Sequence, residues 1–249
     1  MEKKALIKEL LKYRYAHRGL HNKPVIAENS MTAFELAVKE GFGIELDIHL
    51  TRDNNLAVIH DASLKRTCGI DLKIEELDIS EAKMYLLEES DDAIPDFEEV
   101  LEMVDGRIPL IVELKVVDDN VDAICRRTAG ILRNYKGPVC VESFDPRAVK
   151  WFKDHEPQFV RGQLAGALGK TDPEFSKKND FLLKNLLVNF YCKPDFVAYR
   201  FDDRDEAGIK RYKGPKFFWT IKDYAHLKEA EAMGAAGIFE QFNPKDYEK

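Results

Sequence analysis

Short apolar runs alternate with segments of helical periodicity along almost the whole of this 249-residue chain. Eight of the runs have the length and composition of buried strands, and they lie at residues 13–16, 44–48, 109–115, 138–142, 159–163, 196–200, 217–221 and 237–239. The segments between them have the apolar spacing and end residues of helices, and they lie at residues 30–40, 96–105, 120–135, 146–155, 181–190, 205–212 and 224–233. Strands that alternate with helices usually form a parallel sheet. The alternation therefore predicts an α/β protein.

Eight strand–helix units in a chain of this length favour a (β/α)8 TIM-like barrel. A doubly wound sheet is the alternative, but no Gly-x-Gly-x-x-Gly motif follows the first run. A further apolar run at 56–59 follows the turn 52–55 and is the companion of run 44–48. Residues 62–96 are polar, with an acidic run at 88–92, and we expect a small insertion on the barrel rim. We therefore predict a single barrel domain over residues 1–249.

The composition argues against several classes of protein. A net charge of −7 without a long basic run disfavours a nucleic-acid-binding surface. No stretch approaches the roughly 18 apolar residues of a transmembrane helix, and the N-terminus lacks a signal-peptide core. The four cysteines are widely spaced without a Cys-x-x-Cys pair, which predicts reduced thiols and a cytoplasmic protein. The start of the chain has helical spacing, and we expect a helix that closes the bottom of the barrel rather than a membrane-surface helix.

Two carboxylates lie close together on the second predicted strand. Side chains alternate between the two faces of a strand, so Glu45 and Asp47 share one face while their apolar neighbours share the other. Like charges this close repel unless a cation lies between them or one of them takes up a proton. Oxygen ligands suit a hard divalent ion such as Mg²⁺ or Ca²⁺. We therefore expect a divalent cation at this strand.

Polar side chains also gather where the other predicted strands end, which is the end of a barrel that carries the chemistry. They are His17, Arg18, His60, Glu113, Lys115, Glu142, Ser143, Gln163 and Trp219. Each one alone has a structural explanation, since a single histidine is often a hydrogen-bonded structural residue and a Glu-x-Lys pair is often a salt bridge. Carboxylates, imidazoles, a guanidinium and an ammonium from separate strands together indicate a functional site.

The motifs around these residues resemble those of the glycerophosphodiester phosphodiesterase family. The matching segments are Ala16-His17-Arg18-Gly19, Glu28-Asn29-Ser30, Gly43-Ile44-Glu45-Leu46-Asp47, Thr51-Arg52-Asp53, Val58-Ile59-His60-Asp61, Ile94-Pro95 and Val112-Glu113-Leu114-Lys115. They follow one another in the family's order over roughly the first 115 residues. Beyond them the match is limited to Ser143-Phe144-Asp145, Trp219-Thr220 and the last strand. The family usually has Thr-Asp before a proline there, whereas this chain has Glu240-Gln241-Phe242-Asn243-Pro244.

The resemblance implies a role for each of these side chains. One of the two histidines would be the general base and the other the general acid. We prefer His17 as the base and His60 as the acid. Glu45, Asp47 and Glu113 would hold one divalent cation, while Arg18 and Lys115 would bind phosphate oxygens. Glu28 would position a substrate hydroxyl or act as a structural acceptor, and Trp219 would face the head group or pack in the core.

We therefore predict a metal-dependent hydrolase that cleaves small glycerophosphodiesters to glycerol 3-phosphate and an alcohol. One alternative is a lyase-type phospholipase that forms a cyclic phosphate, although no hydrophobic loop is evident around the site. The other is a barrel that binds a phosphorylated ligand without turning it over. The head group, the native ion, the first nucleophile and the oligomeric state stay open at this point.

Overall fold

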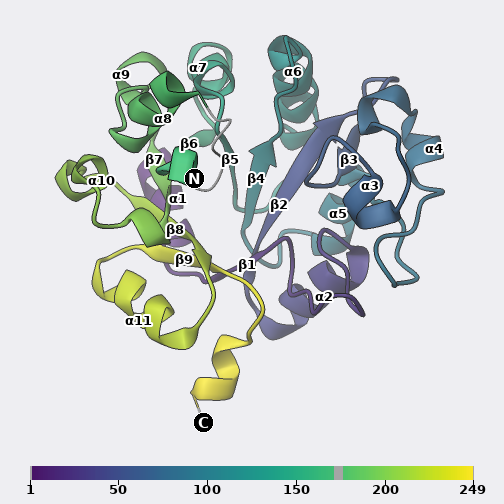
Figure 1. The fold of residues 1–249 in the computed structure, drawn as a ribbon, viewed down its shortest axis with the longest axis horizontal. Coiled ribbons are helices and arrows are strands. Elements are labelled where there is room, and N and C mark those ends of the chain that lie inside the picture. Colours follow the sequence, from purple (N-terminus) through teal and green to yellow (C-terminus); the bar gives the residue numbers. More distant parts are fainter. Residues whose placement is uncertain (1, 171–175, 249) are drawn as a thin grey trace.

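Eight parallel strands form a closed barrel in the computed structural model, which describes residues 2–170 and 176–248 (Figure 1). The strands are β1 (Tyr15–His17), β2 (Gly43–Leu50), β4 (Leu110–Leu114), β5 (Val139–Ser143), β6 (Val160–Ala165), β7 (Phe196–Arg200), β8 (Lys216–Ile221) and β9 (Ala236–Phe239). The barrel closes because β1 pairs in parallel with both β2 and β9, so that Ala16 lies between Ile44 and Phe239. The predicted α/β barrel is thus confirmed.

Most of the helices surround the barrel on the outside (Figure 1). The helices of the described residues are α1 (Lys3–Leu10), α2 (Met31–Glu40), α3 (Lys65–Cys68), α4 (Ile79–Ala82), α5 (Phe97–Val104), α6 (Val121–Leu132), α7 (Pro146–His155), α8 (Lys177–Lys184), α9 (Asn189–Cys192), α10 (Ala207–Arg211) and α11 (Tyr224–Ala232), with short 3₁₀ turns η1 (Ile74–Glu76), η2 (Leu168–Lys170), η3 (Phe201–Asp203) and η4 (Pro244–Tyr247). No helix of the described residues is long and apolar enough to cross a bilayer.

The N-terminal helix α1 closes the end of the barrel at which the strands begin, as expected. Its Leu10 is fully buried, and Leu6, Ile7 and Leu11 pack against the same apolar cluster. That cluster contains residues from the beginnings of the strands, among them Tyr15, Val160, Phe196, Phe217 and Ala236. Because side chains fill this end, the space available to a ligand lies at the opposite end of the barrel.

The segment from residue 56 to 96 extends the barrel beside β2. Strand β3 (Leu56–Val58) pairs antiparallel with the end of β2, and α3, η1 and α4 follow it. These elements lie together on one side of the barrel (Figure 1). Their apolar side chains form a small separate core, which includes Ile59, Leu64, Ile74 and Ile94. The predicted single domain also includes residues 1, 171–175 and 249, which lie outside the described part of the chain.

One predicted helix is wrong in its extent. The sequence predicts a helix over 181–190, but the chain forms α8 and then, after a break, α9. Leu186 has a left-handed backbone (φ 57°), and the Tyr199 hydroxyl donates to the Lys184 carbonyl oxygen (2.8 Å) at the end of α8. Seven of the ten residues of this stretch are apolar, and their spacing suits one continuous helix, so spacing alone did not reveal the break. Most other predicted ends agree within about three residues.

Candidate active site

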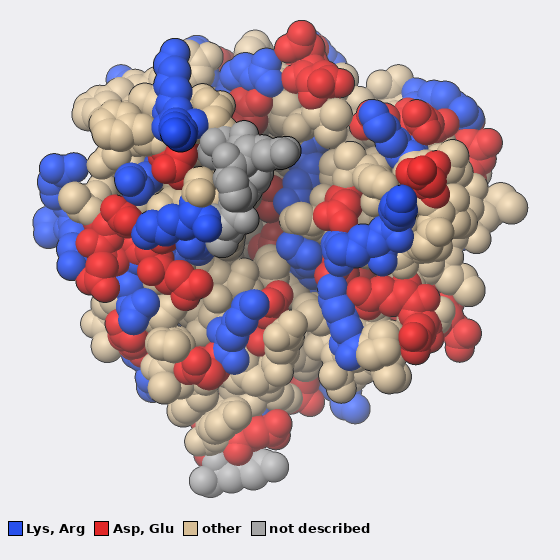
Figure 2. Space-filling view, viewed as in Figure 1, with Lys and Arg blue, Asp and Glu red and all other residues tan. Residues whose placement is uncertain are grey.

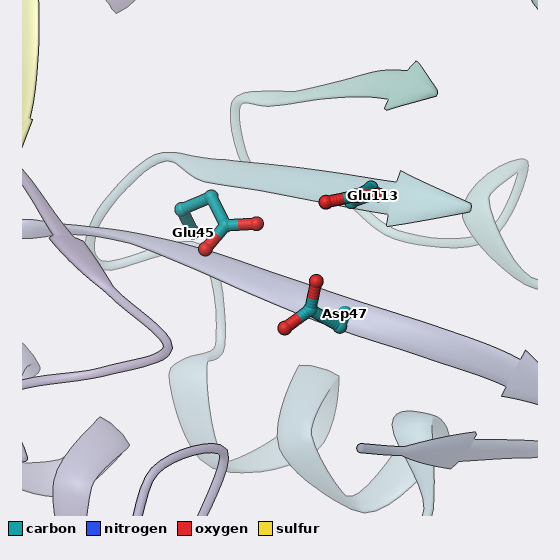
Figure 3. A group of neighbouring side chains, drawn as sticks. All are labelled: Glu45, Asp47 and Glu113. Atoms are coloured by element: carbon teal, nitrogen blue, oxygen red, sulfur yellow. The ribbon is translucent and has the colours of Figure 1, made fainter. Parts of the chain in front are cut away.

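Three carboxylates meet at the carboxyl end of the barrel. Glu45 and Asp47 come from β2 and Glu113 comes from β4, where Glu113 is the direct register partner of Asp47. One oxygen of each side chain lies within 4.8 Å of the others, and all three residues are buried. Figure 3 shows the carboxylates of the two strands directed toward a shared space. The structure thus brings together the three residues that the family pattern assigns to a cation.

The charges of this cluster are only partly balanced by the protein. Burial raises the pKa of Glu45 and of Glu113, and the neighbouring carboxylates raise it further in both. Burial acts the same way on Asp47, but Lys115, His60 and Arg18 together hold its pKa well below the ordinary value. The Lys115 ammonium lies 2.9 Å from Asp47 Oδ1 and 2.7 Å from Glu113 Oε1. A buried, oxygen-only group with this excess of negative charge fits a divalent cation.

His17 is the last residue of β1 and faces this cluster. Its Nδ1 lies 2.8 Å from Glu240 Oε2, and its Nε2 lies 3.8 Å from Glu45 Oε2. Burial lowers the pKa of His17 to about 4, and the charge of Arg18 acts in the same direction. Although burial disfavours ionised Glu240, the hydrogen bond from His17 lowers the pKa of that carboxyl to about 2. A neutral imidazole beside a carboxylate donates from Nδ1, which leaves the Nε2 lone pair free.

His60 has the same kind of partner on the other side of the site. Its Nδ1 lies 2.5 Å from Asp61 Oδ1, and this hydrogen bond holds the pKa of Asp61 well below its ordinary range. Arg66 donates to the second oxygen of Asp61 (2.6 Å). The ring of His49 lies 3.0 Å from the His60 carbonyl oxygen, so it fixes the backbone that carries His60. Each of the two histidines therefore has a carboxylate at Nδ1.

Arg18 is held from several directions. Its backbone N–H donates to Glu45 (3.2 Å), and its guanidinium donates to Glu28 Oε1 (2.9 Å) and lies 3.3 Å from Asp47. Glu28 is buried and also accepts from Arg66 (2.7 Å) and forms an ion pair with Lys23. Its oxygens are occupied by these cations, so the structure gives Glu28 an orienting position rather than an exposed one.

A narrow cavity of about 80 Å³ lies between these groups. It is lined by His17, Arg18, Glu45, His60, Glu113, Lys115, Glu142, Phe144, Leu164, Trp219, Thr220 and Ile238. Trp219 packs edge-on against Phe144, with ring centres 5.5 Å apart, and thus borders the cavity from β8. Figure 2 shows this end of the barrel as a hollow in which basic and acidic side chains meet.

Other polar residues at the strand ends have different positions. The Gln163 amide donates to the carbonyl oxygens of Ser143, Phe144 and Leu164, so this residue is structural. Glu142 lies in register with Glu113 and lines the cavity. Burial raises the pKa of Glu142 well above its ordinary value, and the charges of neighbouring carboxylates add to this effect.

The sequence did not reveal the roles of Glu240, Asp61 and His49. The signal for Asp61 was present, since it follows His60 directly. The signal for Glu240 was its departure from the usual end of the last strand.

The family model described as the glycerophosphoryl diester phosphodiesterase family matches residues 17–242. The chain belongs to this family. The Bacillus subtilis (strain 168) protein YhdW is 29% identical over 238 residues, which are 91% of this chain and 93% of YhdW. A glycerophosphodiester phosphodiesterase of Bacillus altitudinis is 42% identical over 109 residues, which are 41% of this chain and 44% of the relative.

Solved structures of related phosphodiesterases have the same barrel fold as this chain. The Oleispira antarctica phosphodiesterase OLEI02445, solved in complex with the product sn-glycerol-3-phosphate, has a TM-score of 0.79 at 20% identity. The alignment covers 97% of this chain and 98% of that one. The predictions of family, barrel fold and phosphodiesterase class are therefore confirmed.

Proposed function

We propose that this phosphodiesterase hydrolyses glycerophosphodiesters to glycerol 3-phosphate and an alcohol with the help of one divalent cation. The observation that carries the proposal is the placement of His17 and His60, each with a carboxylate at Nδ1, beside the cluster of Glu45, Asp47 and Glu113. The product in the Oleispira antarctica complex is sn-glycerol-3-phosphate. Because that phosphodiesterase has a similar fold, its product supports the same product class for the present chain.

Glu45, Asp47 and Glu113 would hold the cation, which we propose to be Mg²⁺ or Ca²⁺ because all available ligand atoms are carboxylate oxygens. Such an ion supplies charge neutralisation at the phosphate and lowers the pKa of a bound hydroxyl. Arg18 and Lys115 lie against the same carboxylates, so their remaining N–H groups would bind phosphate oxygens as negative charge develops there.

The histidines would move the protons. Neutral His17 presents Nε2 toward the cavity, so it would accept the proton of the attacking hydroxyl. His60 lines the same cavity and would donate a proton to the leaving alkoxide. Trp219 would contact the group attached to that oxygen, while Glu28 would keep Arg18 in place and so contribute to substrate binding indirectly.

The test is a comparison of three histidine variants on glycerophosphocholine. His17→Ala and His60→Ala should each reduce kcat by about two to four orders of magnitude, which is the usual contribution of a general acid or base. His155→Ala is the matched control, because His155 is exposed at the end of α7 and should leave kcat unchanged. Normal turnover by either site variant would contradict the assigned roles.

The cation and the product are tested in the same assay. Removal of divalent ions with EDTA should abolish turnover, and addition of Mg²⁺ or Ca²⁺ should restore it; full activity in chelator would exclude the ion. Phosphorus NMR of the product should show glycerol 3-phosphate. A cyclic phosphate would instead assign the protein to the lyase-type phospholipases.

We also propose a cytoplasmic location. The support is that all four cysteines are free thiols, three of them buried, as is usual where thiols stay reduced. Cell fractionation should find the protein in the cytoplasmic fraction, and recovery from a secreted fraction would contradict this.

A further inference from the structure

The segment formed by α8, α9 and the turn between them exposes four large apolar side chains. The exposed fractions are 57% for Phe181, 38% for Leu187, 81% for Phe190 and 51% for Tyr191. We call these four residues the α8–α9 patch. Single exposed apolar side chains are common on protein surfaces, but several together usually mark an interaction site. Figure 2 shows uncharged side chains gathered at its upper left, where α8 and α9 lie in Figure 1.

The segment that carries the patch, residues 176–193, has an excess of basic residues, whereas the whole protein is acidic. Between residues 176 and 193 the chain has Lys177, Lys178, Lys184 and Lys193 against the single acidic residue Asp180. No ion pair joins any of these four lysines to an acidic side chain within the described residues. The chain as a whole has a net charge of −7. A basic surface with exposed aromatic rings is complementary to anionic lipid, since rings settle at the interface and lysines attract its head groups.

The inner face of the same two-helix segment leads to the active site. Leu182, Leu183 and Val188 line a groove of about 690 Å³, whose other apolar walls include Leu114, Val116 and Phe144. The groove reaches His60, Glu113 and Lys115, which also line the narrow catalytic cavity. The sequence shows no evident hydrophobic loop around the site, and the apolar walls formed by Leu182, Leu183 and Val188 come instead from a mainly helical segment that is far from the catalytic motifs in the sequence.

We propose that the α8–α9 patch docks onto the surface of anionic lipid bilayers. The rings of Phe190 and Tyr191 insert among the head groups, and the surrounding lysines supply the preference for negative charge. The groove then lies between the bilayer surface and the catalytic histidines. The docking does not depend on the proposed function, because it concerns binding to lipid and not turnover.

The test is co-sedimentation of the full chain with vesicles of equal parts phosphatidylglycerol and phosphatidylcholine. The native protein should sediment with these vesicles and much less with pure phosphatidylcholine. The double variant Phe190→Ser/Tyr191→Ser should bind more weakly by on the order of tenfold, because it loses two inserted rings. Replacing Lys177 and Lys178 by Gln should weaken binding to a similar degree at low salt. Met84→Ser is the matched control, since Met84 is 78% exposed but lies beside α4, and should bind normally.

Two outcomes would overturn the proposal. One is that the native protein does not sediment with the anionic vesicles, or that the ring and lysine variants sediment as well as it does. The other is that the ring variant converts a dimer to a monomer in light scattering, which would make the patch an interface between two copies of the chain. Turnover of soluble glycerophosphocholine by the ring variant should equal that of the native protein, which shows that the variant is folded.

Discussion

The two histidines of the candidate site are held in the same way by residues from different parts of the chain. His17 donates to Glu240, and His60 pairs with the adjacent Asp61. A carboxylate at Nδ1 fixes both the ring orientation and the tautomer, and both histidines line the narrow cavity. On the proposed mechanism the carboxylates act through the imidazoles, as positioning residues.

This arrangement predicts the effect of Glu240→Gln. The amide can donate to Nδ1 as well as accept from it, so the wrong tautomer of His17 becomes accessible. We expect kcat to fall by on the order of ten- to a hundredfold, with KM and the melting temperature nearly unchanged. Lys222→Gln is the control, because Lys222 lies 3.6 Å from Glu240 with its side chain 65% exposed, and should have little effect. A normal kcat for Glu240→Gln would show that His17 does not need this partner.

The sequence predicted those site residues whose placement depends on local rules. Alternation along a strand placed Glu45 and Asp47 on one face, and the carboxyl ends of the strands gathered His17 and Glu113. It could not predict that Glu240 contacts His17, because that contact joins residues 223 apart in the chain. Such a pairing depends on the register in which β1 and β9 meet.

Among the secondary-structure elements, the strands are predicted well from the sequence, because each apolar run is short and has polar or turn residues at its ends. The helices of the C-terminal half are less regular, and the break between α8 and α9 lies in a stretch whose apolar spacing suits one continuous helix. The packing of the strands themselves depends on small residues at particular places. Gly162 on β6 is one of them: a Cβ added there would lie 2.1 Å from the ring of Phe196. That ring is fully buried and packs against Phe217, with ring centres 4.8 Å apart.

Two glycine-to-alanine changes should therefore have opposite effects. Gly162→Ala forces the Phe196 ring out of its place and should lower the free energy of unfolding by about 1–3 kcal/mol. Gly130→Ala adds a methyl group in open space within α6 and should raise it by about 0.5–1 kcal/mol. Urea unfolding of both variants measures the difference. Equal stability of the Gly162→Ala variant and the native protein would show that the strand can shift to admit the methyl group.

For the molecule as a whole, neutral histidines enclosed in the fold link stability to pH. Burial lowers the pKa of His21 to about 4, and the pKa values of His17 and His49 are lowered in the same way. His21 is 6% exposed, and neither of its ring nitrogens has a hydrogen-bond partner within the described residues. The unfolded chain, where histidine has a pKa of about 6.5, binds protons that the folded chain does not.

The sign of the effect follows from this difference. The folding free energy contributed by neutral His21 is fully present above about pH 6.5, and it is lost as the pH falls from there to about 4. Within that window one such histidine contributes a slope of up to about 1.4 kcal/mol per pH unit. Urea unfolding at a series of pH values should show a shallower loss for His21→Leu than for the native protein. Identical slopes would mean that His21 takes up its proton over the same pH range in the folded and the unfolded chain.

The contact between His17 and Glu240 spans the seam at which the first strand of the barrel meets the last. A nascent chain that has emerged only as far as β8 contains every motif of the first 115 residues, yet its His17 still lacks the carboxylate that orients it. On the role proposed for His17, full turnover therefore requires completion of the ring. A partially synthesised or C-terminally clipped molecule should turn over phosphodiesters more slowly than the full chain, so the rate of turnover should report whether the two ends of the barrel have joined.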